Sequence, residues 1–282
     1  MPLLSVIMAS KNEDILYLKK CVDSIQHQTF TNFVFYIVIE ENDYNFQYFK
    51  KLTFNNDNIK LLINKKKPGV AVARNIGIQN SQSKYIAIID SDDFYDLNKF
   101  KKQITFLEKK KNISLIGSNL FLVDGKDNIV GQRLYPQNSN EIKKQFLYKM
   151  PVANPSIVIR RDDINEVGLF DDNFNKAEDF ELWLRFLAKN KKMYNIQENL
   201  VYYRTTGDAN KKRGPRHYKN YYIALKRHSK FIWPFGIRSI SLLMFFIIQL
   251  IPNWYLSILL NTKIVNKIKS IKTDISKINV IK

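Results

Sequence analysis

Short apolar runs alternate with amphipathic stretches along the first half of the chain. The apolar runs predict strands at residues 4–8, 33–39, 59–63, 84–89 and 113–123. Between them, apolar residues recur at the spacing of a helix face and predict helices at residues 14–28, 44–54, 70–79 and 97–109. This β-α-β-α order indicates an α/β fold with a mostly parallel sheet and helices on both faces. Ligands bind such sheets at the carboxyl ends of the strands, so polar residues that follow strands are the candidates for a functional site.

A different pattern occupies the C-terminal part of the chain. Residues 239–262 include no charged side chain, and a run of this length is sufficient to span a bilayer. Because Pro252 and Asn253 interrupt it, we expect two short helices, at 237–251 and 253–271, that lie in or dip into a membrane interface. Two alternatives stay open, a helical hairpin buried in a soluble domain and a true transmembrane span.

The charge of the chain is concentrated in the same C-terminal part. The 282 residues have a net charge of +19, and residues 205–282 hold 15 lysines and arginines against two acids. Residues 1–204 therefore have a net charge of only +6. We expect a globular domain at 1–204 and a basic helical region at 205–282 that binds an anionic membrane surface. A basic nucleic-acid-binding protein is the alternative, but the sequence contains no recognised nucleic-acid-binding motif, and we expect no nucleic acid partner.

Other compositional features exclude several kinds of site. Cys21 is the single cysteine, which excludes a disulfide scaffold and a cysteine-based zinc site. The chain has neither the glycine-rich loop of dinucleotide-binding proteins nor a P-loop. The first residues carry no basic segment, so we expect no signal peptide.

The strongest local feature is an acidic cluster directly after a predicted strand. The apolar run Tyr-Ile-Ala-Ile-Ile at 85–89 is followed by Asp90, Ser91, Asp92 and Asp93. Carboxylates two positions apart in an extended turn can face one point, and carboxylate oxygens suit Mn²⁺ or Mg²⁺. The cluster alone also fits an ordinary turn that caps the next helix.

A second motif precedes the acidic cluster and gives it a context. Residues 69–77 read Gly-Val-Ala-Val-Ala-Arg-Asn-Ile-Gly, and residues 178–185 read Glu-Asp-Phe-Glu-Leu-Trp-Leu-Arg. With the Asp-Ser-Asp-Asp turn between them, these motifs strongly resemble glycosyltransferase family 2, the inverting nucleotide-sugar transferases with a GT-A fold. Asn-Pro-Ser at 154–156 and Gly-Leu-Phe-Asp at 168–171 also match the family's pattern. The resemblance covers residue 3 to about residue 204.

The resemblance implies roles for individual residues. Residues at strand ends and in the motifs would bind the nucleotide sugar: Ala9, Ser10, Glu40, Arg74, Asp90, Ser91 and Arg204. Asp92, together with Asp90, would hold the metal ion, Mn²⁺ or Mg²⁺. At the nucleoside position, the family's usual Asp-Asp-Gly-Ser is replaced here by Ile-Glu-Glu-Asn at 39–42. This departure bears on which nucleobase the chain would bind more than on its fold.

Asp179 matches the general base of the family, with Glu178 as the second candidate. An inverting transfer is a single displacement, so a carboxylate must take the proton of the acceptor hydroxyl opposite the leaving group. Acids at the start of a helix are also favoured by the helix dipole, which is the structural alternative for this pair. Residues 205–215 predict either a flap over the donor or a basic loop.

The expected function is therefore transfer of a sugar, UDP-linked, to a hydroxyl of a lipid-linked or polysaccharide acceptor. The resemblance places this reaction in bacterial surface polysaccharide, capsule or cell-envelope biosynthesis, at the cytoplasmic face of the plasma membrane, with the protein attached peripherally. A non-catalytic family member and a sugar nucleotidyltransferase are alternatives. The second would need a glycine-rich N-terminal loop, which residues 8–12 do not provide.

Overall fold

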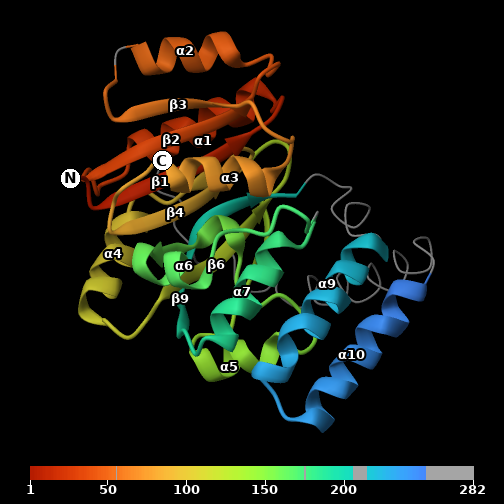
Figure 1. Cartoon of the computed structure of the whole chain (residues 1–282). Helices are drawn as coiled ribbons and strands as arrows, with labels where there is room; N and C mark the ends of the chain where they lie inside the picture. The colour runs from red at the N-terminus through yellow and green to blue at the C-terminus, as the bar shows by residue number, and fades with distance from the viewer. Residues whose placement is uncertain (55, 175, 206–214, 252–282) are drawn as a thin grey trace.

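A computed structural model describes residues 1–54, 56–174, 176–205 and 215–251 (Figure 1). Its main feature is one nine-stranded sheet with the order β3-β2-β1-β4-β8-β6-β9-β5, in which β7 pairs with β6. The longest pairings are parallel, namely β1 with β2 and β4, β2 with β3, and β6 with β9. The α/β fold with a mostly parallel sheet, predicted from the hydrophobic pattern, is confirmed.

The first half follows the expected alternation of strands and helices. Its elements are β1 (Leu4–Ser10), α1 (Ile15–Gln26), β2 (Phe33–Glu40), α2 (Phe46–Phe54), β3 (Ile59–Asn64), α3 (Val70–Gln79) and β4 (Tyr85–Asp90). Each lies within a few residues of its predicted range. Asp14 caps α1, because its carboxylate accepts the backbone N–H of Leu16 at 2.8 Å.

The second half is less regular. Its elements are β5 (Phe94–Tyr95), α4 (Lys99–Lys109), β6 (Leu115–Val123), β7 (Ile129–Arg133), α5 (Ser139–Gln145), η1 (Asn154–Ser156), β8 (Val158–Arg160), α6 (Arg161–Val167), α7 (Glu178–Ala188) and β9 (Met193–Arg204). The short strand β8 runs antiparallel between β4 and β6 and joins the two halves of the sheet.

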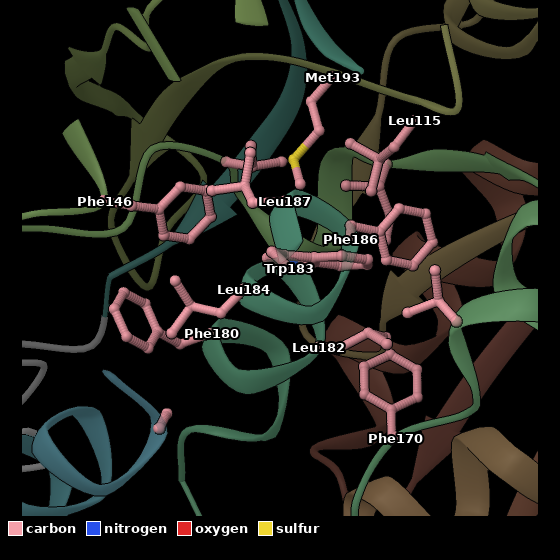
Figure 2. Packing of buried hydrophobic residues seen from close by; sticks show 14 of the residues in the cluster. Leu115, Phe146, Phe170, Phe180, Leu182, Trp183, Leu184, Phe186, Leu187 and Met193 are labelled. Carbon is pink, nitrogen blue, oxygen red and sulfur yellow. The ribbon is translucent and has the colours of Figure 1, made fainter. Parts of the chain in front are cut away.

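Two hydrophobic cores lie on the two faces of the sheet. On β4, Ile86 and Ile88 belong to one core while Ala87 and Ile89 belong to the other, as alternation along a strand requires. Helices α3, α6 and α7 cover the first face, and α1, α2 and α4 cover the second. Figure 2 shows the first core around Trp183, which is fully buried on α7.

Close packing explains the glycine at the end of the motif at 69–77. A Cβ at Gly77 would lie 2.5 Å from the side chain of Ile7, so α3 approaches β1 too closely for any larger residue. This close approach places the side chains of α3 beside the carboxyl ends of β1 and β4.

The basic C-terminal region continues the first core. Helix α9 (Pro215–His228) and the turn η2 (Ser229–Phe231) pack beside α7, and α10 (Phe235–Leu250) packs against α9 (Figure 1). Buried residues of these elements, including Tyr221, Leu225, Trp233 and Phe245, belong to the same core as Trp183. Helix α10 matches the helix predicted at 237–251, whereas the helix predicted at 253–271 and most of the predicted flap lie outside the described residues. Among the described helices, none has the length and apolar character needed to cross a membrane.

Candidate functional site

The ends of three neighbouring strands form the floor of the candidate site. In the register of the sheet, Ala9 of β1 is paired with Asp90 of β4, and Ser10 with Ile39 of β2. Ala9 is partly exposed, whereas the hydroxyl of Ser10 is buried. The acidic turn, residues 90–93, follows β4 at this edge.

The acidic turn is held by side chains from other elements. The hydroxyl of Tyr95 accepts the backbone N–H of Asp90 at 2.8 Å. Asp93 is buried and accepts the backbone N–H of Arg204 at 2.8 Å. Burial, with the nearby charges of Asp92 and Asp90, raises the pKa of Asp93 well above its ordinary value. Asp93 is therefore an internal support of the turn, while Asp90 and Asp92 are partly exposed.

Arg204 lies against the acidic turn. Its Nε donates to the carbonyl of Asp92 at 3.0 Å, and its Nη1 donates to the carbonyl of Asp124 at 3.0 Å. Its Nη2 pairs with Asp127 at 2.6 Å, and the guanidinium lies 3.7 Å from the ring centroid of Tyr17. Through these contacts Arg204, the last residue of β9, supports the acidic turn. Its predicted contact with the nucleotide sugar stays a prediction.

Arg74 joins the acidic turn to α7. This side chain of α3 is 5% exposed; its Nη2 lies 2.9 Å from an oxygen of Asp90 and its Nη1 lies 2.8 Å from an oxygen of Glu178. The two carboxylates raise the pKa of Arg74, so the guanidinium keeps its charge in spite of its burial. Arg74, predicted to bind the nucleotide sugar, therefore contacts the acidic turn, and its contact with a donor stays a prediction. Its bond to Glu178 was not predicted, because nothing local to either residue indicates the other.

Asp179 follows Glu178 in the first turn of α7. Desolvation raises its pKa to about 7, with a further contribution from the charge of Glu178. The charge of Arg74 and the backbone N–H of Phe180, which donates to Asp179 at 2.7 Å, act in the opposite direction. A carboxylate with a pKa near 7 is well matched to accept a proton at neutral pH.

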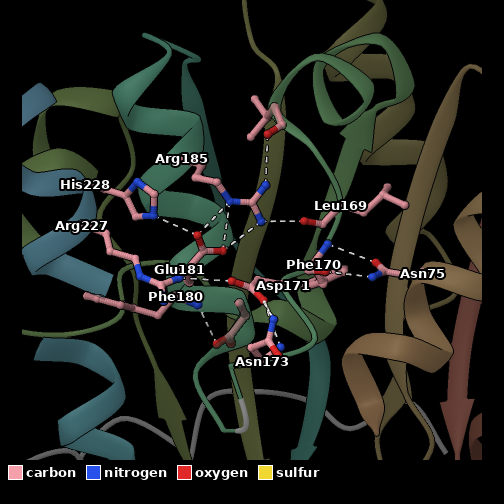
Figure 3. A network of polar contacts seen from close by, with 12 residues as sticks. Asn75, Leu169, Phe170, Asp171, Asn173, Phe180, Glu181, Arg185, Arg227 and His228 are labelled. Carbon is pink, nitrogen blue, oxygen red and sulfur yellow. Dashed lines mark hydrogen bonds and ion pairs between the residues drawn. The ribbon is translucent and has the colours of Figure 1, made fainter. Parts of the chain in front are cut away.

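The remaining acid of this helix turn has a different environment. Glu181 accepts two hydrogen bonds from Nε of Arg185, at 2.9 and 3.0 Å, and pairs with His228 of α9 at 2.9 Å (Figure 3). These partners lower the pKa of Glu181 despite its burial. Arg185 also donates to the carbonyls of Val167 and Leu169, so it fixes the loop that precedes α7.

That loop is also tied to α3 and to α9. Asn75 donates to the carbonyl of Phe170 at 2.8 Å and accepts its backbone N–H at 3.0 Å (Figure 3). On the other side, Arg227 of α9 pairs with Asp171 at 3.3 Å. In the motif at 69–77, Arg74 thus contacts the start of α7 and Asn75 contacts the loop before it. Asn75 was not among the predicted site residues, although its place in this motif could have indicated it.

A polar cavity lies at the end of β2, where a nucleobase site was predicted. It has a volume of about 270 Å³ and is lined by Lys11, Asn12, Glu40, Glu41, Asn64 and Lys65, among others. An oxygen of Glu40 accepts the side-chain amide of Asn64 and the backbone N–H of Gly69, both at 3.3 Å. Glu40 therefore connects this cavity to the start of α3.

Two residues of the loops around this cavity were not among the predicted site residues. Asp43 is buried and accepts the backbone N–H of Asn12 at 2.7 Å. Asn45 donates to the carbonyl of Glu13 at 2.8 Å. Ser91 lies on the same side, with its hydroxyl 3.4 Å from Glu13. The loop after β1 is thus fixed to the loop after β2.

The acidic turn offers only part of a metal ligand set. Among the described residues, no three acidic, histidine or cysteine side chains are grouped closely enough to hold a metal ion. Asp90 and Asp92 present carboxylate oxygens, which suit Mn²⁺ and Mg²⁺, and these ions commonly complete their shell with substrate phosphates and water. The two carboxylates fit such an ion provided that a phosphate-bearing ligand supplies further oxygens.

The chain matches known glycosyltransferases in sequence. Residues 5–168 match the family model described as Glycosyl transferase family 2. An uncharacterized glycosyltransferase of Methanocaldococcus jannaschii is 29% identical over 98% of this chain and 96% of its own length. The Escherichia coli protein WfgD, a UDP-Glc:alpha-D-GlcNAc-diphosphoundecaprenol beta-1,3-glucosyltransferase, is 31% identical over 67% of this chain and 71% of its own length.

Solved structures of transferases share the fold. The Staphylococcus aureus protein TarS in complex with UDP-GlcNAc superposes with a TM-score of 0.62, at 15% identity, over 86% of this chain and 71% of its own. A mannosyltransferase from Pyrobaculum calidifontis in complex with GDP-Man and Mn²⁺ gives a TM-score of 0.65, at 11% identity, over 90% of this chain and 72% of its own. At these identities the likeness shows the fold, which is the GT-A fold expected from the motifs.

Proposed function

Because the chain belongs to glycosyltransferase family 2 and is a glycosyltransferase, we propose that it catalyses an inverting transfer from a UDP-linked sugar to an acceptor hydroxyl. One observation carries this proposal. Arg74 contacts both Asp90 of the acidic turn and Glu178, which directly precedes Asp179. The donor-side acid and the helix turn of the candidate base therefore lie beside the same guanidinium. A single displacement requires these two functions on opposite sides of one anomeric carbon.

Asp179 is the proposed general base. Its carboxylate takes the proton of the acceptor hydroxyl, while the hydroxyl oxygen forms a bond to the anomeric carbon. The bond from that carbon to the diphosphate breaks at the same time, and the nucleoside diphosphate leaves with the electron pair. The pKa of Asp179, about 7, allows the carboxylate to be ionised at neutral pH yet basic enough to accept a proton.

The donor is proposed to lie along the ends of β1, β2 and β4. The cavity beside Glu40 would take the nucleoside, and Ala9, Ser10 and Ser91 would border the ribose and diphosphate. WfgD is named for a UDP-Glc donor and the TarS structure contains UDP-GlcNAc, which supports a UDP-linked donor here.

Asp90 and Asp92 are the residues that would hold Mn²⁺ or Mg²⁺. When bound together with the donor, such an ion would offset the negative charge that develops on the departing diphosphate. The Mn²⁺ in the Pyrobaculum calidifontis mannosyltransferase structure supports a divalent ion in this fold.

The acceptor is proposed to be a lipid-linked or polymeric glycan at the cytoplasmic face of the plasma membrane. WfgD is named for an acceptor that carries a diphosphoundecaprenol lipid, and AmsE of Erwinia amylovora, 28% identical over 54% of this chain, is named for amylovoran biosynthesis. These names support a role in polysaccharide biosynthesis on a lipid-linked acceptor. The proposal places this role in surface polysaccharide or capsule assembly, with the protein attached peripherally.

Donor binding provides a direct test. The purified chain is heated with UDP-Glc, UDP-GlcNAc or GDP-Man, in Mn²⁺ and in EDTA, because a ligand that binds the folded state raises the melting temperature. We expect a UDP-sugar to raise it in Mn²⁺ and much less in EDTA, and Asp92→Asn to reduce this difference. If no nucleotide sugar in a broad panel is bound or consumed, the proposed function is wrong.

A further inference from the structure

Helix α10 has one buried side and one exposed side, and the exposed side is almost entirely apolar. Ser241 and Phe245 are buried against the rest of the molecule. On the opposite side, at helical spacing, are large apolar side chains that we call the α10 apolar face: Phe235, Ile240, Leu243, Phe246, Ile247 and Leu250. Each is between 44% and 73% exposed, a concentration that a soluble surface helix does not ordinarily present.

The charged residues on α10 and just before it are positive. The only charged residue of α10 is Arg238, and the exposed residues that precede the helix include Lys226 and Lys230. Beyond the described residues, the sequence from 252 to 282 contains six lysines and a single acid, Asp274. An apolar helix face bordered by lysine and arginine complements a bilayer surface that carries anionic headgroups.

The start of α10 has the residue types that suit the boundary between headgroups and acyl chains. Phe231 is 63% exposed and lies 4.8 Å below the ammonium group of Lys230. Phe235 is 73% exposed and lies 5.2 Å from the guanidinium of Arg238. In both pairs an aromatic ring can enter the apolar layer while its cationic neighbour stays among the headgroups.

We propose that the α10 apolar face is the surface by which this protein lies on an anionic lipid bilayer. The helix lies along the surface, because its other side is occupied by contacts with α9 and with the core. The choice of a bilayer over another partner rests in part on the proposed lipid-linked acceptor.

This placement links the lipid-facing helix to the helix of the proposed base. Phe245 of α10 lies 5.6 Å from Tyr221 of α9, and Tyr221 is stacked on Phe180 of α7 with centroids 3.9 Å apart. Phe180 directly follows Asp179. A chain of aromatic contacts through α9 therefore connects α10 to the start of α7, which is the acceptor side of the proposed reaction.

Vesicle binding by the full chain tests the proposal. The pair Leu243→Glu and Ile247→Glu places two charges one helical turn apart on the α10 apolar face. The pair Phe54→Glu and Leu134→Glu is the matched control, because both side chains are exposed and lie outside α10. Sedimentation is measured with vesicles of phosphatidylcholine and with vesicles that also contain phosphatidylglycerol.

We expect the unaltered chain and the control to bind the anionic vesicles, and the α10 variant to bind about tenfold or more weakly. Binding should be weaker on neutral vesicles and should fall as salt is added. Equal binding by the α10 variant, or no binding by the unaltered chain, overturns the proposal. A dimer that the α10 variant converts to monomers, without vesicle binding, would assign the face to a second copy instead.

Donor-induced thermal stabilisation is measured on the same samples. A folded α10 variant should keep the full response to the nucleotide sugar. Loss of vesicle binding with an intact donor response therefore supports the membrane face. Absence of a donor response in the unaltered chain would count against the proposed function alone.

Discussion

The acidic turn and the first turn of α7 are both rich in carboxylates, but the carboxylates of the two regions have different partners. In the acidic turn, the buried member Asp93 is oriented by a backbone N–H of Arg204, while Asp90 is paired with Arg74. In α7, Glu178 and Glu181 are each paired with an arginine, and Asp179 lies between them with a pKa raised to about 7.

The difference shows how three nearby acids acquire separate tasks. Arg185 and His228 lower the pKa of Glu181, which makes it a structural anchor between α7 and α9. Glu178 shares Arg74 with Asp90 and so connects the two acidic regions. Asp179 is the acid whose environment favours the neutral form, which is the property of a proton acceptor at neutral pH.

The largest expected effect comes from removing the charge of Asp179. Asp179→Asn cannot accept the acceptor proton, so we expect the transfer rate to fall about 10³-fold. Donor binding, measured by thermal shift, should be unchanged, because the acidic turn is intact. Asp57→Asn, in an exposed loop, is the control and should retain activity. A variant of Asp179 with ordinary activity would contradict its assignment as the base.

Glu181→Gln is expected to affect stability. It leaves Arg185 and His228 without their carboxylate, and loss of one partner of a buried ion pair costs about 3 kcal/mol. The melting temperature should fall by roughly 6 °C or more. Because the folded-state pKa of Glu181 lies below its ordinary value of 4.5, this contribution is present above pH 4.5 and is lost as the pH falls through the folded pKa. Glu198→Gln, in an exposed pair with Lys102, should change the melting temperature little.

Glu178→Gln is expected to change the pH profile of transfer. Glu178 is a cause of the raised pKa of Asp179, and its removal also leaves the charge of Arg74 less neutralised, so that Arg74 stabilises the ionised form of Asp179 more strongly. Both effects lower that pKa, so the acid limb of kcat/KM should move to lower pH, with about a tenfold loss in the plateau value. Glu178→Asp should restore part of the profile. An unchanged acid limb in Glu178→Gln would show that Asp179 titrates independently of this pair.

The last expected effect is a gain in stability. The ordinary pKa of Asp179 is 3.8 and its folded-state pKa is about 7, so the unaltered protein loses stability as the pH rises from about 4 to about 7. Asp179→Asn avoids this loss and should have a higher melting temperature than the unaltered protein at pH 8, but not at pH 4. A lower melting temperature at pH 8 would indicate that the carboxylate is stabilised by its neighbours.

Local sequence was sufficient for the features that depend on neighbours along the chain. The strands β1 to β4 and the helices between them were predicted within a few residues, because the hydrophobic period reports which side of an element is buried. The acidic turn was predicted because a buried strand ends directly before Asp90. Helix α10 was predicted from its uncharged run, although its one-sided burial was not.

The links between the motifs could not be predicted from the residues themselves. Arg74 and Glu178 are 104 positions apart, Asp93 and Arg204 are 111, and Glu181 and His228 are 47. Each pair forms because the sheet and its covering helices place distant segments side by side. The resemblance to a family indicated that such residues belong to one site, but not which atoms meet.

The sequence by itself determined the order of strands and helices, the acids that follow the strand ends and the uneven distribution of charge, since these depend only on residue type and spacing. The tertiary structure decided which acids are paired with arginine and that Asp93 and Asp179 have raised pKa values, because burial and charge separation exist only once the helices cover the sheet. It also decided that α9 packs against α7 and α10 against α9, leaving one apolar side of α10 exposed.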